Sequence, residues 1–230
     1  MIKKICAALA IVALAVLILA LVALAPLWYE LPALDNLDGM EMCTAENPGC
    51  SQVKVKIEHV PTLLKQAIIA AEDEHFYAHR WSMITAQVAR HLLTVERRQP
   101  QRHMRDVLLI FKLELYLGKD QILEFYINNT FLGHGAYGFE AATQTYFGKS
   151  LTRLTLAETA MLAGLPRSPS SFNPIDNLPR AKERQKRGLE RMLKAGVRGS
   201  AGHQGAADAG LIIGNQTSEV WFHGERGIEF

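Results

Sequence analysis

The sequence predicts a mainly α-helical domain that follows a single membrane-spanning helix. Positions 5–29 form an apolar run without a charged residue, and between positions 53 and 195 apolar residues recur at helical spacing, with little strand-like alternation. The chain of 230 residues is long enough for one domain with its own core. Its 25 Lys and Arg residues against 23 Asp and Glu residues give no basic surface, so we expect no nucleic-acid partner.

The apolar run is the first element. It reads ICAALAIVALAVLILALVALAPLWY, follows Lys3 and Lys4, and is followed by Glu30. A helix of this length spans the roughly 30 Å hydrocarbon core of a bilayer. By the positive-inside rule the two lysines hold the N-terminus in the cytoplasm. Residues 1–30 are therefore predicted to be a cytoplasmic start and a transmembrane anchor, with the rest of the chain outside the membrane, in a bacterium in the periplasm or at the cell surface.

A cleaved signal peptide is the alternative for this segment. Ala23 and Ala25 would suit the small-residue pattern of a cleavage site. The run is longer than a typical signal core, however, and Pro26 would follow the cut directly. Trp28 and Tyr29 also suit the far membrane interface of a spanning helix, so a retained anchor is the favoured interpretation.

Residues 31–52 are rich in Pro, Gly and Asn and are predicted to be a linker. Within it, Cys43 and Cys50 flank the turn-rich sequence TAENPG, and an oxidising compartment favours a local disulfide between them. A metal site at these cysteines is less favoured because no histidine cluster accompanies them. Cys6 lies in the anchor and is expected to be inert packing.

The domain at 53–195 is predicted from helix signals. A first helix begins at Thr62 after Pro61, and a capping box of Thr155 and Glu158 opens another helix that Pro166 stops. Three further helices are expected over 106–117, 119–128 and 179–195. The tail at 196–230 holds 8 of the 17 glycines and carries no useful periodicity, so it is expected to be disordered.

Glu72 is the first candidate for chemistry. It ends an apolar helix and opens the acidic sequence EDE, and His79 would lie on nearly the same face if the helix continued. A carboxylate beside apolar walls has its pKa raised by desolvation, which suits a general base. The alternative is that these acidic residues form a solvated helix end.

Five stretches occur in a characteristic order: EDEHFYAH at 72–79, SMITAQVAR at 82–90, RHMRD at 102–106, KDQILEFYIN at 119–128 and FLGHGAYGFEAATQTYFGK at 131–149. This ordered set resembles the family 51 glycosyltransferases, the peptidoglycan polymerases found alone or as the N-terminal domain of class A penicillin-binding proteins. The resemblance implies a lysozyme-like glycosyltransferase domain over 53–195. It also implies a catalytic site.

The motif matches assign that site residue by residue. The family pattern E-D-x-x-F-x-x-H is matched by EDEHFYAH, and K-x-x-I-L-E-x-Y-x-N is matched by KDQILEFYIN. By resemblance Glu72 and Asp106 are catalytic. The substrate-binding residues implied in the same way are Asp73, Phe76, His79, Ser82, Thr85, Gln87, Arg102, Arg105, Lys119, Glu124 and Asn128.

The chain departs from the family pattern in three places. The family has a longer segment between its first two motifs, where this chain runs from His79 through Arg80 and Trp81 directly to Ser82. The double glycine that usually precedes this serine is missing. The third motif, commonly R-K-x-x-E, ends in Asp106, so the second catalytic carboxylate is one methylene short.

The activity implied by the resemblance is polymerisation of lipid II into β-1,4 glycan strands, with release of undecaprenyl pyrophosphate. Glu72 would deprotonate the acceptor hydroxyl, and Arg102 and Arg105 suit the pyrophosphate by bidentate hydrogen bonding. The family alone implies a divalent cation, Mg²⁺ or Mn²⁺, near Asp106. The implied partners are lipid II, the growing glycan strand, the membrane and other cell-wall synthesis proteins.

The resemblance implies a single-pass protein of the bacterial inner membrane, with its catalytic domain on the periplasmic side. Two alternatives stay open. A lysozyme-like hydrolase or lytic transglycosylase would share the fold and a catalytic glutamate, but would need no arginines for a pyrophosphate. A membrane-anchored pseudoenzyme that binds lipid II without turnover is favoured by the shortened segment and by Asp106.

Overall fold

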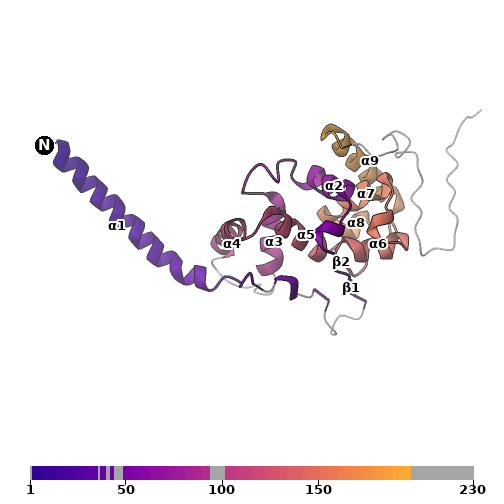
Figure 1. Cartoon of the computed structure of the whole chain (residues 1–230), viewed down its shortest axis with the longest axis horizontal. Helices are drawn as coiled ribbons and strands as arrows, with labels where there is room; N and C mark the ends of the chain where they lie inside the picture. The colour runs from indigo at the N-terminus through magenta and orange to yellow at the C-terminus, as the bar shows by residue number, and fades with distance from the viewer. Residues whose placement is uncertain (1, 36, 40–41, 44–48, 94–101, 198–230) are drawn as a thin grey trace, which may run out of the picture.

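A long helix at the N-terminus stands apart from the remaining helices (Figure 1). The computed structural model describes residues 2–35, 37–39, 42–43, 49–93 and 102–197. The first helix is α1, Ile2–Tyr29. Its segment Leu9–Tyr29 has a mean hydropathy of 3.0 and is not buried in the domain, so length and composition suffice for it to cross a membrane. An N-terminal signal sequence shares these properties, so retention of the anchor stays a prediction.

The rest of the described chain is mainly helical, which confirms the predicted fold class. The strands among the described residues are only two residues long each. In chain order the elements are η1 (Leu37–Gly39), β1 (Ser51–Gln52), η2 (Ile57–His59), α2 (Thr62–Glu72), α3 (Met83–Leu93), α4 (Arg102–Tyr116), α5 (Lys119–Asn129), β2 (Ala136–Tyr137), α6 (Phe139–Phe147), η4 (Leu151–Arg153), α7 (Leu156–Gly164), η5 (Leu165–Arg167), α8 (Pro169–Phe172) and α9 (Leu178–Lys194).

Helix α7 lies at the centre of one half of the domain. All nine of its residues are buried, and it packs against α2 and α9. A Cβ atom at Gly188 of α9 would lie 2.5 Å from the carbonyl oxygen of Ala160. This close approach requires glycine at position 188. In the other half α3 packs against α4 and α5, and α4 lies nearest to the end of α1 (Figure 1).

The predicted helix boundaries mostly agree with the structure. Helix α2 begins at Thr62, and the capping box is present: the Glu158 N–H donates to Thr155 Oγ1 (3.3 Å), and the Thr155 N–H donates to Glu158 Oε2 (2.8 Å). Helix α4 begins at Arg102, four residues before the predicted start at Asp106. The predicted disordered tail lies almost wholly outside the described residues, which end at position 197.

The linker is attached to the domain. Cys43 and Cys50 form the expected disulfide, with Cα atoms 5.5 Å apart. After it, β1 pairs in parallel with β2, and the side chain of Gln52 donates to the Asn128 carbonyl (3.0 Å) and to Asn129 Oδ1 (3.0 Å). A Cβ atom at Gly135 would lie 1.9 Å from the Gly49 carbonyl oxygen, so this contact between linker and domain depends on glycine.

Candidate active site

Glu72, the last residue of α2, lines a cavity of about 620 Å³. Three elements meet there: the end of α2, the exposed face of α3, and η5. The lining residues are Glu72, Met83, Gln87, Arg90, His91, Pro166 and Arg167. Of the residues assigned to the site from the sequence, this cavity brings together Glu72 and Gln87.

The two carboxylate oxygens of Glu72 have different surroundings. Oε2 accepts a hydrogen bond of 2.8 Å from Gln87 Nε2, whereas Oε1 is buried and has no hydrogen-bond partner. Buried polar atoms in folded proteins are normally satisfied, so an orphaned carboxylate oxygen at a cavity marks a position where another group can bind. One oxygen of Glu72 is thus held in place, and the other can accept a proton.

Positive charge surrounds this carboxylate. Arg90 and Arg167 line the cavity, and Arg191 Nη1 donates to the carbonyl oxygen of Ala71, the residue before Glu72 (2.7 Å). Burial lowers the pKa of the Arg184 guanidinium, and the charges of Arg167 and Arg191 lower that pKa further. The arginines therefore lie close enough to interact, which makes the region favourable for an anion with several negative oxygens.

Two neutral side chains complete the surroundings. Burial lowers the pKa of His91, with a smaller contribution from Arg90, so its imidazole is neutral at pH 7. Burial raises the pKa of the Tyr126 hydroxyl, and the carboxylate of Glu72 raises that pKa further. Tyr126 is fully buried, and its hydroxyl has no hydrogen-bond partner. It therefore presents a protonated hydroxyl near Glu72.

The turn after Glu72 differs from the helical continuation considered above. Helix α2 ends at Glu72, so Glu72 and His79 do not share a helical face and that expectation is wrong. The reason is Asp73, whose Oδ2 accepts from the Met83 N–H (2.9 Å) and whose Oδ1 lies 3.4 Å from His79 Nε2. Phe76 is fully buried beneath this turn, 4.7 Å from Lys119 Nζ. Asp73, Phe76 and His79 thus shape the connection to α3.

Ser82 and Thr85 are buried in a polar network. Ser82 Oγ accepts from the Thr85 N–H (3.0 Å), and Thr85 Oγ1 donates to Glu114. Lys119 Nζ donates to the same carboxylate (2.8 Å). None of these residues lines the Glu72 cavity. Glu114, the centre of this network, was not singled out from the sequence, because a lone glutamate in KLELYL is indistinguishable there from a solvated charge.

Arg105 and Asp106 lie at the start of α4 and do not line the Glu72 cavity. Arg105 is buried and donates to Glu30, the residue that follows α1. Asp106 is half-buried, and its Oδ1 is buried without a hydrogen-bond partner. Arg102 is the first residue of α4, but its side chain lies outside the described part of the structure. Substrate binding by these residues stays a prediction.

The cation expected near Asp106 also stays a prediction. Among the described residues, no group of three or more His, Cys, Asp or Glu side chains is placed to hold a metal ion. Asp106 supplies one carboxylate oxygen that is buried without a hydrogen-bond partner.

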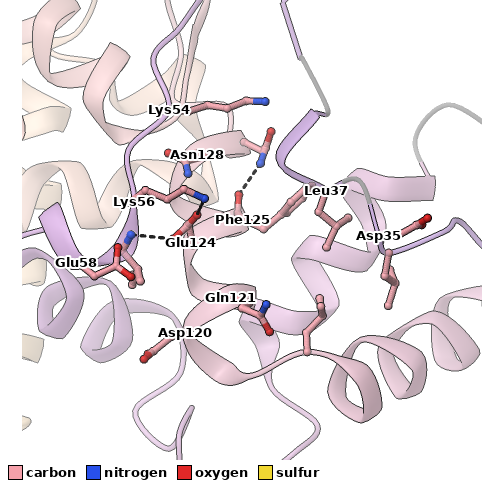
Figure 2. Close-up of a pocket in the computed structure, with 14 residues that line it drawn as sticks. Asp35, Leu37, Lys54, Lys56, Glu58, Asp120, Gln121, Glu124, Phe125 and Asn128 are labelled. Carbon is pink, nitrogen blue, oxygen red and sulfur yellow. Dashed lines mark hydrogen bonds and ion pairs between the residues drawn. The ribbon is translucent and has the colours of Figure 1, made fainter.

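Glu124 and Asn128 belong to a second pocket of about 480 Å³, between α5 and the linker (Figure 2). Glu124 accepts from the Ile57 N–H (2.8 Å) and from Lys56 Nζ (3.2 Å). Asn128 exchanges two hydrogen bonds of 2.9 Å with the backbone of Val55. The polar residues of KDQILEFYIN thus hold the segment that leads into the domain, and their assigned role in substrate binding stays a prediction.

Arg90, His91 and Arg167 were not assigned to the site from the sequence. Arg90 and His91 follow Gln87 by three and four residues, which places them one helical turn further along α3. From this spacing the sequence alone could have placed Arg90 and His91 on the same side of the helix as Gln87. Arg167 comes from LPR, far along the chain, and only the packing of α7 against α2 brings it to Glu72.

Comparisons with known proteins identify relatives of this chain. A family model described as Transglycosylase matches residues 82–193. Penicillin-binding protein 1A of Neisseria flavescens is 45% identical over 166 residues, which cover 62% of this chain and 21% of that protein. A protein of Cupriavidus necator that bears the name transglycosylase is 44% identical over 164 residues, which cover 62% of this chain and 71% of that protein.

A solved structure shows the same fold. The crystal structure of penicillin-binding protein 1A from Haemophilus influenzae matches with a TM-score of 0.51 and 32% identity, over 71% of this chain and 18% of that chain. The chain thus spans about a fifth of the length of these penicillin-binding proteins. Glu72 lies before the residues that the family model matches, which begin at Ser82.

Proposed function

Because the chain belongs to the transglycosylase family, whose members are peptidoglycan glycosyltransferases, we propose that it polymerises lipid II into β-1,4 glycan strands and releases undecaprenyl pyrophosphate. The observation that carries this proposal is the cavity in which Glu72 has one orphaned buried oxygen and two arginines as neighbours. Glycan polymerisation needs both a base for a sugar hydroxyl and positive charge for a pyrophosphate.

Glu72 acts as the general base. Gln87 holds Oε2, which directs the orphaned Oε1 to the proton of the acceptor hydroxyl. The deprotonated oxygen attacks the anomeric carbon of the donor sugar, the bond from this carbon to the pyrophosphate breaks, and the configuration inverts. The proton goes to Glu72. A positioned base of this kind contributes about a hundredfold to ten-thousandfold to a rate.

Arg90 and Arg167 stabilise the leaving pyrophosphate. Both line the cavity with Glu72, and guanidinium groups bind phosphate oxygens through two parallel N–H bonds. Arg105, which the resemblance assigns to the pyrophosphate, pairs with Glu30, and its role in substrate binding stays a prediction. Preorganised charges aimed at a leaving group lower the barrier because they need no reorganisation during the reaction. No step of this mechanism uses a cation.

The membrane is part of the proposed setting. With α1 retained as an anchor, the domain stays beside a substrate that is itself held in the bilayer, and Lys3 and Lys4 place the domain on the periplasmic side. The growing glycan strand is then the second substrate. Other cell-wall synthesis proteins are further partners that this setting allows.

A second candidate function is lipid II binding without turnover. The observation that favours it is the position of Asp106, which lies outside the Glu72 cavity although the family resemblance makes it the second catalytic carboxylate. Glycan cleavage is less favoured, because hydrolysis of a glycosidic bond releases no anion for the arginines around Glu72 to bind.

The test is to incubate the full chain in detergent with labelled lipid II and to separate the products on a gel. Glycan polymer supports the proposal. Unchanged lipid II together with measurable binding supports the non-catalytic candidate, and breakdown of added glycan strands supports a hydrolase. The variant Glu72→Gln, which keeps shape without basicity, should bind lipid II and form no polymer.

A further inference from the structure

His91 lies in the Glu72 cavity and has no part in the mechanism proposed above. It lines the cavity together with Glu72, Arg90 and Arg167. Helix α3 places it one turn beyond Gln87, the residue that donates to Glu72 Oε2. One side of α3 therefore holds the proposed base and also presents an imidazole ring to the space beside that base.

The hydrogen-bonding groups of the His91 ring are unused. Its Nδ1 is buried without a partner, and neither ring nitrogen takes part in a hydrogen bond or an ion pair within the described part of the chain. By contrast, His79 Nε2 lies 3.4 Å from Asp73 Oδ1, and His134 Nε2 lies 3.4 Å from Asp176 Oδ1. Because folding normally satisfies buried polar atoms, the ring of His91 is the one placed to bind another group.

The charged groups of the cavity come from three elements. Arg90 precedes His91 on α3, Arg167 comes from η5, and Glu72 comes from the end of α2. Burial lowers the pKa of His91, and the charge of Arg90 lowers that pKa further. No carboxylate among the described residues is close enough to raise it. The ring is therefore neutral at about pH 7 in the free chain.

Two further helices, α4 and α5, pack against α3, and they supply no ion pair to His91. Glu114 of α4 accepts from Lys119 of α5 (2.8 Å). Arg105 of α4 donates to Glu30, outside the cavity. Asp106 of α4 makes no hydrogen bond through its buried Oδ1. Within the described chain, His91 thus has no anionic partner.

An anion in the cavity changes the balance of charge at His91. An opposite charge within about 4–6 Å of a titratable group favours the charged form of that group. A pyrophosphate beside Arg90 and Arg167 brings negative oxygens next to the ring. The imidazolium form donates through both ring nitrogens, whereas the neutral ring donates through one, and hydrogen bonds from a cation to phosphate oxygens are charge-assisted.

We propose that His91 is a third cationic contact for the pyrophosphate of the substrate and that it takes up a proton when the substrate binds. This inference rests on the proposed function. The proton comes from solvent, no covalent bond changes, and the ring returns the proton to solvent when the pyrophosphate leaves the cavity. Substrate binding is thereby linked to pH through a residue that is separate from the base.

Substrate affinity depends on pH because of this proton. His91 is neutral in the free chain above its lowered pKa and charged in the complex, so the complex holds one proton more. Affinity for lipid II should therefore fall as the pH rises from below about 6.5 to the pKa of the ring in the complex. Within this interval the Kd should rise by about tenfold per pH unit, since one proton is exchanged.

The first test counts protons by titration calorimetry. The Glu72→Gln chain in detergent is titrated with lipid II at about pH 7 in buffers of different ionisation enthalpy. This background forms no polymer, and it lacks the carboxylate of the cavity as a second acceptor of protons. Lipid II keeps its own charge near neutral pH because both of its phosphates are esterified. Any uptake of protons is then a property of the chain.

We expect uptake of about half a proton to one proton in the Glu72→Gln chain. Addition of His91→Asn, which keeps a hydrogen-bonding side chain that does not titrate, should abolish the uptake. His59→Asn, at an exposed position in η2, is the matched control and should keep the uptake. Uptake that persists with His91→Asn, or no uptake in the Glu72→Gln chain, would overturn the proposal.

The second test leaves His91 unchanged. The ring nitrogens of nitrogen-15-labelled histidine are observed by NMR in the Glu72→Gln chain before and after addition of lipid II. A neutral ring gives two well-separated nitrogen signals, whereas an imidazolium ring gives two signals that lie close together. We expect the ring with the lowered pKa to change from the first pattern to the second. A spectrum in which every ring keeps its pattern with lipid II bound would contradict the proposal.

Kinetics separate this inference from the proposed function. His91→Asn should raise the KM for lipid II more at about pH 6 than at about pH 8, and an equal rise at both would count against the charge on His91. Proton uptake by a chain that forms no polymer would uphold the role of His91 and remove the catalytic activity. Polymer formation by a chain that takes up no proton would uphold the activity and remove the role of His91.

Discussion

Two regions carry residues of the family motifs, and their polar groups are satisfied to different degrees. At the end of α2, Glu72 has an oxygen without a hydrogen-bond partner beside a cavity. On α5, Glu124 uses both oxygens to hold residues 56 and 57, and Asn128 pairs with the backbone of Val55. Motif membership alone therefore does not separate chemistry from architecture. The hydrogen bonding of each polar atom adds a second criterion, because folding normally satisfies the groups it uses, and it supports Glu72 over Glu124 as the proposed base.

The largest expected effect is at Glu72. Glu72→Gln keeps the size of the side chain but removes its basicity, so polymerisation of lipid II should fall about a hundredfold or more. The melting temperature should stay within error. Glu74→Gln, an exposed neighbour in the same acidic sequence, is the control and should polymerise normally. Equal rates of polymerisation for Glu72→Gln and the unmodified chain would contradict this prediction. Glu72 would then have no catalytic role, like Glu124.

The next effect is expected at Arg90. Arg90→Gln removes a guanidinium from the cavity, and loss of one charge-assisted hydrogen-bonding group should lower kcat/KM for lipid II by about tenfold or more. Steady-state kinetics with labelled lipid II measure this. Arg187→Gln, at an exposed ion pair with Glu183 on α9, should change kcat/KM little. A similar loss in both variants would indicate a general effect of net charge.

Glu124 should show the opposite behaviour. Glu124→Ala leaves the Ile57 N–H without its acceptor, so we expect a loss of about 1–3 kcal/mol in the free energy of unfolding. Activity per folded molecule should change much less than in Glu72→Gln. Urea denaturation and polymerisation of the same samples give both values. Glu58→Gln, exposed in the same pocket, serves as control. A folded Glu124→Ala protein with no activity would assign α5 to the substrate after all.

The smallest effect is expected for the tail. Deletion of residues 198–230 removes a glycine-rich segment with little capacity to bury apolar surface, so the melting temperature and the rate of polymerisation should both stay unchanged. Differential scanning calorimetry tests the first expectation. A fall of several degrees would show that this segment packs against the domain.

Much of the fold was predictable because helical periodicity and capping are local. The run from Thr62 to Glu72 and the Thr155–Glu158 capping box carry their signals within a few residues. The end of α2 was less certain, since the bond from the Met83 N–H to Asp73 that turns the chain joins residues ten positions apart. The short connection from His79 to Ser82 carries no sequence signal that predicts this hydrogen bond.

The site was predictable only in part. Glu72 and Gln87 were found because a resemblance placed them in motifs, and the cavity joins them. The assignment of Arg105 to a pyrophosphate stays a prediction, and its partner Glu30, which lies 75 residues earlier in the chain, was not foreseen. Glu124 similarly pairs with Ile57, 67 residues away. No local pattern reveals such contacts, because they depend on how the linker and the anchor pack against the domain.

The junction between α1 and α4 leaves the domain little freedom to move relative to α1. Glu30 contacts Arg105 directly after α1 ends, and Lys112 holds the next two carbonyl groups. A flexible tether would let the cavity move through a volume of solvent, whereas, with α1 retained as the proposed anchor, this junction would keep the cavity at one height above the bilayer. For the membrane-bound substrate proposed above, encounter would then become a two-dimensional search, in which the number of molecules per unit of membrane area replaces the bulk concentration.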